Sequence, residues 1–389
     1  MIDDLKPSVF VRRGADGHPE QQATACLTAL PGSGSLSFQA CADGREVVTP
    51  VAVPVADEVT VYLPLLAAAG ELRVELLCDG ETVAGRTLPW TPPRQWTVHL
   101  VNLSHHDVGY TNLPSLVLEM QRQSLLQYLE LARAADHYPD PAQQRIVVEQ
   151  CWSVDYFLRH ATAGEAEALL ARVRSGHVEL TALFGNMTTE LCGHESFIRN
   201  LYQGARLAQR TGVPIVSAEH CDIPGVARGL AEILTGSGIE FLDCAFPYYD
   251  SWGGEADRPA FWDVSAVFGN RETPGAFWWE APSGRRLLVW SNNVGCNGEN
   301  DPALPRLAAA LRTYEDEGYP YSVMRWPVTG SSRDNSPYVD FATTVKTWNE
   351  AWLSPRLICS TNANFYADLK VQLPADLPVH HGDIPGQDY

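Results

Sequence analysis

The sequence predicts an α/β protein with two parts, a small all-β sandwich-like domain over residues 1–93 and a larger domain over residues 96–389. Two observations lead to this prediction. In the first part, short segments with alternating apolar residues are separated by turn signals that contain glycine. In the second part, strand-length apolar segments alternate with longer segments whose apolar residues recur at helical spacing.

The size and composition of the chain fit this organisation. The chain has 389 residues, which is longer than one typical domain, and its 45% of hydrophobic residues is ordinary for a globular protein. No run of about 18 apolar residues occurs, so we expect no membrane span. The first residues, Met-Ile-Asp-Asp-Leu-Lys, lack the basic and apolar regions of a secretory signal.

Nine cysteines are scattered along the chain without a Cys-X-X-Cys motif, which indicates neither a disulfide framework nor a zinc ribbon. We expect most of them to be buried free thiols in a reducing compartment, and we therefore expect a cytoplasmic protein. Cys192 and Cys221 lie near polar residues, but packing in the core is the role that we expect for both.

The chain is strongly acidic, with a formal net charge of −19 and a pI near 4.9. Such a surface repels phosphate backbones and anionic lipids, so we expect neither nucleic acid nor a membrane as a partner. A neutral carbohydrate substrate fits better, although acidity that serves solubility alone explains the charge equally well. The oligomeric state stays open, with a homo-oligomer among the options.

The first 93 residues have the pattern of a small antiparallel sandwich. Alternating apolar residues occur at 35–38, 59–63 and 72–77, and Asp-Gly turn signals occur at 43–44 and 79–80. We see no catalytic cluster in this part. We interpret it as a structural cover, with a sugar-binding module as the less favoured alternative, and the prolines after Trp90 as the start of a linker.

The second part alternates strands with helices. We expect strands at 97–103, 145–149, 178–183, 214–218, 239–242, 286–290 and 355–359. We expect helices at 116–135, 165–174, 196–209, 226–234, 304–317 and 339–352. This alternation predicts parallel strands with right-handed crossovers, arranged either as a barrel or as a doubly wound sheet.

Polar side chains follow four successive strands of this part. His105 and Asp107 follow the first strand, Glu149 the second, residues 186–190 the third and residues 219–222 the fourth. The carboxyl ends of such strands share one rim, which is where catalysis takes place in βα folds. His105 and Asp107 are two residues apart and share a face, so they can bind one cation, and zinc accepts this mixed set. A polar surface loop is the alternative for this pair alone.

Residues 243–300 are rich in aromatic residues, which include Trp278 and Trp279. Aromatic rings near a polar rim stack on the CH faces of sugars, so the stretch fits a carbohydrate cleft. Each of these residues taken singly is more often part of a core. The turn at 283–284 predicts that residues 286–290 form the second arm of a hairpin.

Four segments in order resemble the catalytic domain of glycoside hydrolase family 38, the zinc-dependent class II α-mannosidases. They are the His-X-Asp-X-Gly-aromatic motif at 104–110, and the segments at 219–225, 277–284 and 348–357. The resemblance covers most of residues 96–385 and implies a seven-stranded (β/α) barrel-like domain with Zn²⁺ on its rim. The chain ends inside a His/Asp/Gly-rich stretch, so we expect a divergent member that is truncated at its C-terminus.

The resemblance also assigns metal ligands. It implies that His105 and Asp107 bind zinc and that a histidine near the end of the domain, His381 or its neighbour His380, is another ligand. The remaining family ligand is an aspartate that is also the glycosyl nucleophile, and the best alignment places Thr189 there. A neutral hydroxyl cannot replace a carboxylate that forms and releases a glycosyl ester.

The catalytic residues that the resemblance implies are therefore Glu190 or Asp222 as the nucleophile and Asp334 as the acid/base. A helix N-terminal acid is the alternative role for Asp222. The substrate-binding residues that we expect are Tyr110, Glu149, Trp278 and Trp279.

The sequence thus predicts a zinc-dependent, α-mannosidase-like glycoside hydrolase that retains the anomeric configuration of a neutral glycoside. One alternative is a catalytically decayed zinc- or sugar-binding protein on the same scaffold, which the threonine at the nucleophile position favours. Another is a zinc-dependent carbohydrate deacetylase, in which water is the nucleophile and the missing aspartate is not needed.

Overall fold

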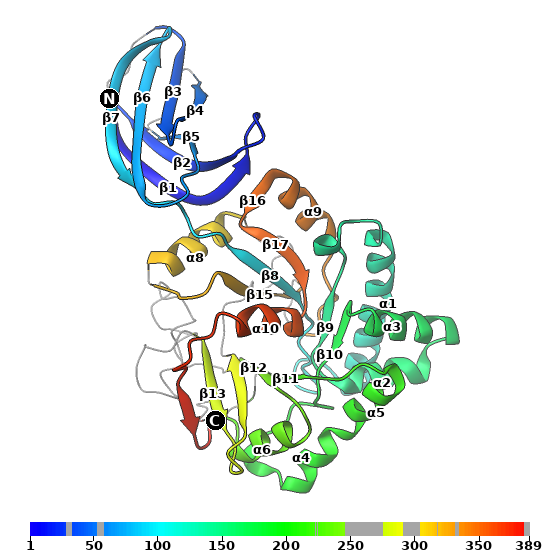
Figure 1. Cartoon of the computed structure of the whole chain (residues 1–389). Coiled ribbons are helices and arrows are strands. Elements are labelled where there is room, and N and C mark those ends of the chain that lie inside the picture. Colours follow the sequence, from blue (N-terminus) through cyan, green and yellow to red (C-terminus); the bar gives the residue numbers. More distant parts are fainter. Residues whose placement is uncertain are drawn as a thin grey trace. The chain divides into compact units, whose positions relative to one another are not determined.

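The computed structural model describes residues 1–28, 33–52, 58–221, 223, 225–245, 275–290, 304–316, 318–330 and 334–384 (Figure 1). Contacts divide the chain into two compact units. Unit 1 consists of Met1–Thr97, Leu304–Gly318 and Thr347–Leu357, and unit 2 consists of Val98–Ala303, Tyr319–Lys346 and Ile358–Tyr389. The structure is mixed α/β, which confirms the predicted class at this level. None of the described helices is both long and apolar enough to cross a membrane.

Unit 1 contains two four-stranded antiparallel sheets with the orders β16-β1-β2-β5 and β4-β3-β6-β7. Their strands, drawn mostly in blue and cyan in Figure 1, are β1 (Ile2–Arg13), β2 (Pro19–Leu27), β3 (Leu36–Ala42), β4 (Arg45–Val51), β5 (Glu58–Pro64), β6 (Gly70–Cys78), β7 (Glu81–Trp90) and β16 (Trp352–Ser354). Side chains from both sheets form one hydrophobic core. The unit also contains helix α8 (Leu304–Asp316), so an all-β sandwich bounded at residue 93 stays a prediction.

The two Asp-Gly turn signals form the hairpins that the sequence indicates. Asp43 and Gly44 connect β3 to β4 with φ angles of 51° and 73°, and Asp79 and Gly80 connect β6 to β7 with φ angles of 51° and 88°. Two-residue hairpin turns need positive φ at both positions, and aspartate followed by glycine tolerates this conformation best.

Unit 2 alternates strands with helices from β8 onward. Its strands are β8 (Thr97–Asn102), β9 (Ile146–Val148), β10 (Val178–Leu180), β11 (Ser217–Cys221), β12 (Phe241–Ala245), β13 (Ala276–Glu280), β14 (Arg286–Trp290), β15 (Val323–Val328), β17 (Arg356–Ser360) and β18 (Val379–His381). Its helices are α1 (Pro114–Ala135), α2 (Cys151–His160), α3 (Ala163–Arg174), α4 (His194–Asn200), α5 (Tyr202–Thr211), α6 (Arg228–Gly236), α9 (Ala342–Ala351), which crosses the border with unit 1, and α10 (Asn362–Lys370).

The strands of unit 2 pair mostly in parallel. β9 pairs with β10, and β11, β12 and β14 follow one another in parallel, whereas β13 runs antiparallel to β14 and completes the predicted hairpin. A parallel bridge from Leu103 to Val147 connects the end of β8 to β9. The backbone N–H of Ala182 donates to the carbonyl of Ser217 at 2.9 Å, which connects the end of β10 to β11. The end of β8 therefore lies beside β9, and the residues after β10 lie beside the start of β11.

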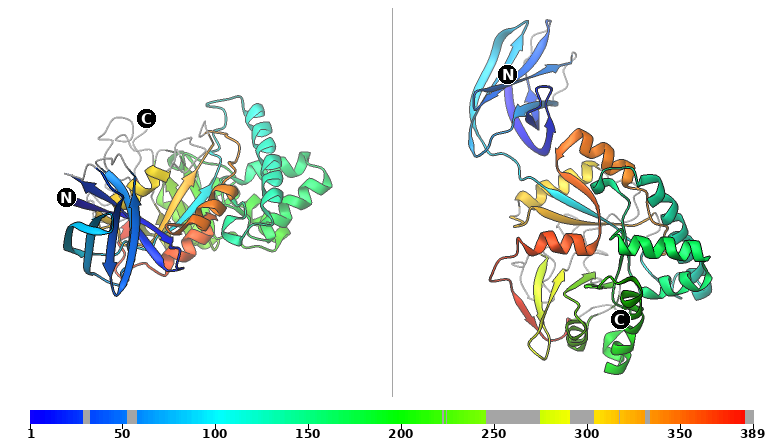
Figure 2. Two further views of the ribbon diagram at one scale, coloured as in Figure 1. Left: turned by 90° about the horizontal axis from the view of Figure 1, so that it is seen from above. Right: turned by 45° about the vertical axis from the view of Figure 1, so that its right-hand side comes forward.

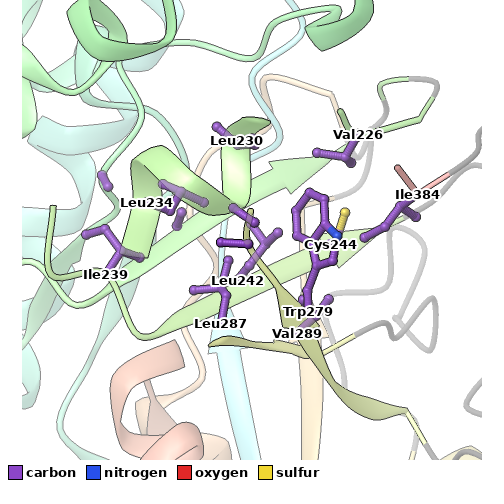
Figure 3. Packing of buried hydrophobic residues seen from close by; sticks show 14 of the residues in the cluster. Val226, Leu230, Leu234, Ile239, Leu242, Cys244, Trp279, Leu287, Val289 and Ile384 are labelled. Carbon is purple, nitrogen blue, oxygen red and sulfur yellow. The ribbon is translucent and has the colours of Figure 1, made fainter. Parts of the chain in front are cut away.

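Two hydrophobic clusters hold these strands in place. In one cluster, apolar side chains of α1, α2, α3 and α5 pack on β9 and β10, and Figure 2 shows these helices gathered beside the two strands. In the other, Leu230 and Leu234 of α6 lie over β12, β13 and β14 (Figure 3). Burial of each leucine of this kind contributes about 1.5–3 kcal/mol, so the helices fix the strands whose ends carry the polar residues.

Candidate active site

Unit 2 contains a buried polar cluster formed by residues at or after the ends of its strands. His105 follows β8, Glu149 follows β9, Asn186 lies in the loop after β10, and Cys221 is the last residue of β11. His105, Glu149 and Cys221 are buried, and Glu149 is 0% exposed. Contacts of Glu149 with His105 and Asn186, and of Asn186 with Cys221, bring together residues that are far apart in the sequence.

His105 and Glu149 form the centre of this cluster. The His105 Nδ1 atom lies 3.1 Å from Oε2 and 3.2 Å from Oε1 of Glu149. The backbone N–H of His106 donates to Oε2 of the same carboxylate at 2.8 Å. Burial by itself raises the pKa of Glu149, but the charge and hydrogen bonds of His105 and the donors of His106 outweigh it and hold the pKa at about 2. Glu149 is therefore a carboxylate at neutral pH.

Cys221 completes a group of three candidate metal ligands. One ligand atom each of His105, Glu149 and Cys221 lies within 4.8 Å of the other two. Nitrogen, oxygen and sulfur are all atoms that zinc accepts, so this donor set fits the metal that the family pattern implies. Burial raises the pKa of the Cys221 thiol, and the nearby His105 opposes this effect.

Asn186 connects two members of this group. Its side-chain amide donates to Glu149 Oε1 at 3.1 Å and to the backbone carbonyl of Cys221 at 3.0 Å. Gln150 in turn donates to Asn186 Oδ1 at 2.8 Å. These bonds fix the carboxylate of Glu149 relative to the end of β11.

Asp334 lies beside the His105 motif. It forms a parallel bridge with His105, and the backbone N–H of Asn335 donates to the His105 carbonyl at 2.8 Å. The Asn335 side chain donates to the backbone carbonyl of Asp107 at 2.7 Å. The loop with the predicted acid/base is thus held against the predicted metal motif, although the two are more than 200 residues apart in the sequence.

Other predicted site residues lie outside the three-residue group. Asp107 is half-buried, and among the described residues it is not part of the group within 4.8 Å. Tyr110 is 86% exposed. His381 is on β18 with a side chain that is 58% exposed, and its Nδ1 atom lies 3.2 Å from Glu280 Oε1. Asp222 lies outside the described residues.

Thr189 and Glu190 are next to each other in a short 3₁₀ turn, Thr189–Leu191. Thr189 is buried, and its hydroxyl accepts the backbone N–H of Ala227 at 2.8 Å and donates to Glu190 Oε2 at 3.2 Å. Glu190 itself is exposed. Thr189 therefore holds the start of α6 and contacts its acidic neighbour.

The two predicted substrate-binding tryptophans differ in their surroundings. Trp278 is half-buried, whereas Trp279 is fully buried in the hydrophobic core (Figure 3). The Trp279 indole N–H donates to the carbonyl of Gly382 at 2.8 Å. A side chain that is enclosed in this way has no free ring face for a sugar to stack on.

Several residues of the site were not predicted. Cys221 was assigned to core packing, and Asn186 and Gln150 were not singled out as a pair. Asparagine directly after an apolar strand, next to a run of polar residues, is the signal that could have indicated Asn186.

A second polar network, between β11, β12 and β15, was not predicted either. Arg325 Nη2 lies 2.5 Å from Asp243 Oδ2 and 3.7 Å from Glu219 Oε1. Asn362 accepts from Arg325 Nε at 2.9 Å and donates to Glu219 at 3.2 Å. Burial raises the pKa of Asp243 to about 6, although Arg325 opposes the rise. An arginine inside an apolar strand segment was the signal for this network.

The fold and the cluster define a class of protein, in which parallel strands separated by helices carry a buried group of metal-binding residue types at their carboxyl ends. Within that class the chain belongs to a known family. Residues 95–383 match the family described as "Glycosyl hydrolases family 38 N-terminal domain", which confirms the resemblance of the sequence segments.

One solved structure agrees with this assignment at the level of the fold, and a second is reported for comparison. An alpha-mannosidase from Enterococcus faecalis V583 is similar with a TM-score of 0.56 and 15% identity, over 75% of this chain and 31% of that chain. A glycosyl hydrolase family 38 protein from Enterococcus faecalis has a TM-score of 0.48 and 16% identity, over 74% of this chain and 29% of that chain. The chain therefore spans about a third of the length of these proteins. No curated protein matches it.

Proposed function

We propose that this chain is the catalytic part of a zinc-dependent, α-mannosidase-like glycoside hydrolase that retains the anomeric configuration. The observation that carries the proposal is the match to family 38 over residues 95–383, within which His105 contacts the buried carboxylate of Glu149. The similar Enterococcus faecalis V583 protein is an alpha-mannosidase by name. A neutral α-mannoside suits an acidic chain with a net charge of −19.

The proposal includes a seven-stranded (β/α) barrel-like domain in unit 2. The parallel pairs β9–β10 and β11–β12–β14 support it, as do the helices between β9 and β10 and between β11 and β12. So do the links from β8 to β9 and from β10 to β11, because they continue the order of the chain from one strand to the next.

His105 is the residue that we expect in any zinc site of this chain. Its proposed partners come from the family pattern, Asp107 and His381, or from the buried cluster, Glu149 and Cys221. When bound, zinc supplies Lewis acidity that binds sugar hydroxyls and favours a distorted ring. Tyr110, which is 86% exposed, and the half-buried Trp278 are proposed to contact the sugar.

Two carboxyl groups carry the proposed reaction. The carboxylate of Glu190 or Asp222 attacks the anomeric carbon while Asp334 gives its proton to the departing glycosidic oxygen. Asp334 then takes a proton from the water that cleaves the glycosyl ester. The bridge between Asp334 and His105 supports the role of Asp334, and the hydrogen bond from Thr189 to Glu190 supports an oriented carboxylate at residue 190.

Hydrolysis of a panel of aryl glycosides by the full chain tests this proposal. We expect turnover of α-mannosides that a chelator abolishes and zinc restores, and NMR of the first product should show the configuration of the substrate. Asp334→Asn should lower turnover by about a hundredfold or more. The absence of turnover on every α- and β-glycoside by the zinc-loaded protein would contradict the proposal.

A second candidate function is sugar binding without hydrolysis. Thr189 favours it, because the family's nucleophile position has a hydroxyl that is already engaged with Ala227 and Glu190. Calorimetric titration with mannose oligosaccharides distinguishes the two candidates. Binding without turnover, unchanged in Glu190→Gln, supports the binding protein, whereas a large loss of turnover in that variant supports the hydrolase.

A further inference from the structure

We propose that Cys221 is a metal ligand, and that it forms a cation site with His105 and Glu149. This ligand set contains a thiolate and differs from the Asp107 and His381 set that the sequence pattern assigns. The inference rests on the proposed function for the presence of a divalent cation in unit 2. It goes further by naming the side chains that bind the cation.

The geometry of the three side chains carries the inference. They come from the ends of β8, β9 and β11, and their ligand atoms lie within 4.8 Å of one another. The His105 Nδ1 and Glu149 Oε2 atoms are 3.1 Å apart. Two ligands of one tetrahedral zinc ion, each at about 2.0–2.1 Å from the metal, lie roughly 3.3 Å apart. The pair is therefore already spaced as two ligands of one ion.

The surroundings of the three residues are those of a built site. Glu149 Oε2 accepts from the His106 N–H at 2.8 Å, and Glu149 Oε1 accepts from the Asn186 amide at 3.1 Å. The two bonds fix the orientation of the carboxylate. Asn186 also accepts from Gln150 at 2.8 Å. Hydrogen bonds of this kind orient metal ligands and are worth about 10- to 100-fold in metal affinity.

The placement of Cys221 is unusual for a cysteine that only fills space. Among the described residues, the buried Cys359 on β17 and Cys244 on β12 are not part of a ligand group, whereas Cys221 lies beside the His105–Glu149 pair. A thiolate is a strong ligand for zinc and for cobalt. Three protein ligands leave one position of a tetrahedral ion for water or a sugar hydroxyl, which is the arrangement of catalytic zinc sites.

The alternative ligands are less well placed. His381 is exposed on β18 and pairs with Glu280, and Asp107 is half-buried with its backbone carbonyl bound by Asn335. The competing explanation of the cluster is a buried ion pair between His105 and Glu149, with Cys221 as a packing residue. That explanation predicts no metal–sulfur bond.

Cobalt titration of the chelator-stripped full chain tests the inference. We expect one Co²⁺ per chain by elemental analysis and a near-ultraviolet thiolate-to-cobalt charge-transfer band. Cys221→Ser should lose the band and bind cobalt at least about 100-fold more weakly. Cys359→Ser is the matched control, because it removes a buried free thiol from β17, outside the ligand group, and it should keep the band. Cobalt binding to the parent protein without the band, or a band that persists in Cys221→Ser, overturns the inference.

A second pair of variants decides the question if Cys221→Ser does not fold, as judged by circular dichroism. Asp107→Asn and His381→Gln should keep the band and the stoichiometry, and loss of cobalt binding in both overturns the proposed ligand set. Hydrolysis is measured separately on the parent protein. Zinc-dependent turnover without a thiolate band contradicts the ligand set alone, whereas a band without turnover contradicts the hydrolase alone.

Discussion

The backbone N–H of Asn335 donates to the carbonyl of His105 at 2.8 Å, and this bond holds the Asp334 loop against the end of β8. Asn335 adopts a left-handed conformation with φ of 53°, and its side chain donates to the carbonyl of Asp107 at 2.7 Å. Asparagine is one of the few residues other than glycine that tolerate this conformation. One residue therefore aligns the proposed acid/base with the metal motif.

Replacement of Asn335 tests this alignment. Asn335→Ala loses the bond to Asp107 and strains the positive φ, so we expect a loss of stability of about 1–3 kcal/mol in chemical denaturation. Asn335→Gly keeps the backbone relaxed and removes only the side-chain bond, so it should be less destabilising. If the glycine variant is the less stable of the two, the backbone conformation is not what selects asparagine here.

A second prediction is that Asn186 positions the proposed metal ligand Glu149. Asn186→Ala removes the donor shared by Glu149 and the Cys221 carbonyl, and we expect metal affinity to fall by about 10- to 100-fold. Competition with a chromophoric chelator measures this change. Asn364→Ala, on α10 outside the cluster, is the control and should leave the affinity unchanged. Equal affinities of parent and Asn186→Ala would show that the amide does not position a metal ligand.

The alternation of strands and helices was readable from the sequence because most core strands are runs of apolar residues. The bounds of the predicted strand at 239–242 and of the helices at 116–135 and 226–234 lie within three residues of those of β12, α1 and α6. The predicted helix at 196–209 is two helices that meet at Leu201. Where the apolar residues recur at regular spacing, the secondary structure predicted from the sequence agrees with that of the fold.

The prediction was wrong where polar residues are buried inside strands. The strand expected at 214–218 is β11, Ser217–Cys221, so Glu219 and Cys221 are in the strand and not beyond its end. β15 was missed because Arg325 interrupts its apolar residues. Both errors have one cause, since Arg325 and Glu219 belong to the same buried network, which joins different strands. Local sequence patterns carry no information on such long-range pairing.

Local sequence patterns also fail to show which distant residues of the candidate site are neighbours. His105 was predicted as a metal ligand because its motif is local, at 104–110, and Asp334 was predicted as the acid/base because of the family resemblance. The grouping of His105 with Glu149 and Cys221 depends on which strand ends become neighbours, and only the fold determines this. A lone cysteine in an apolar strand is more often a packing residue, so Cys221 had no local signal that distinguished it.

The buried network of Asp243 predicts a pH dependence of stability. Burial raises the pKa of Asp243 to about 6 from an ordinary value of 3.8. A carboxyl group whose pKa is raised on folding stabilises the fold fully below pH 3.8 and loses this contribution as the pH rises through about 6. Urea denaturation at intervals from pH 4.5 to 7.5 should therefore show this contribution declining with pH.

Asp243→Asn isolates this contribution. The amide does not titrate, so the decline between pH 4.5 and 7.5 should be smaller than in the parent protein. Identical pH slopes of the two proteins would rule out Asp243 as the titrating group.

Thr189 gives a prediction about the position that the family uses for its nucleophile. Thr189→Val keeps the shape of the side chain and removes the hydroxyl that accepts the Ala227 N–H and donates to Glu190. The Ala227 N–H is then left without this acceptor, so we expect a loss of about 1–3 kcal/mol by chemical denaturation. Turnover should also fall if Glu190 is the nucleophile, because its carboxylate loses an orienting donor.

Thr189→Ser is the control, because it keeps the hydroxyl and should retain both the stability and the turnover of the parent protein. A Thr189→Val protein with the stability and turnover of the parent would mean that the hydroxyl neither holds α6 nor orients the carboxylate.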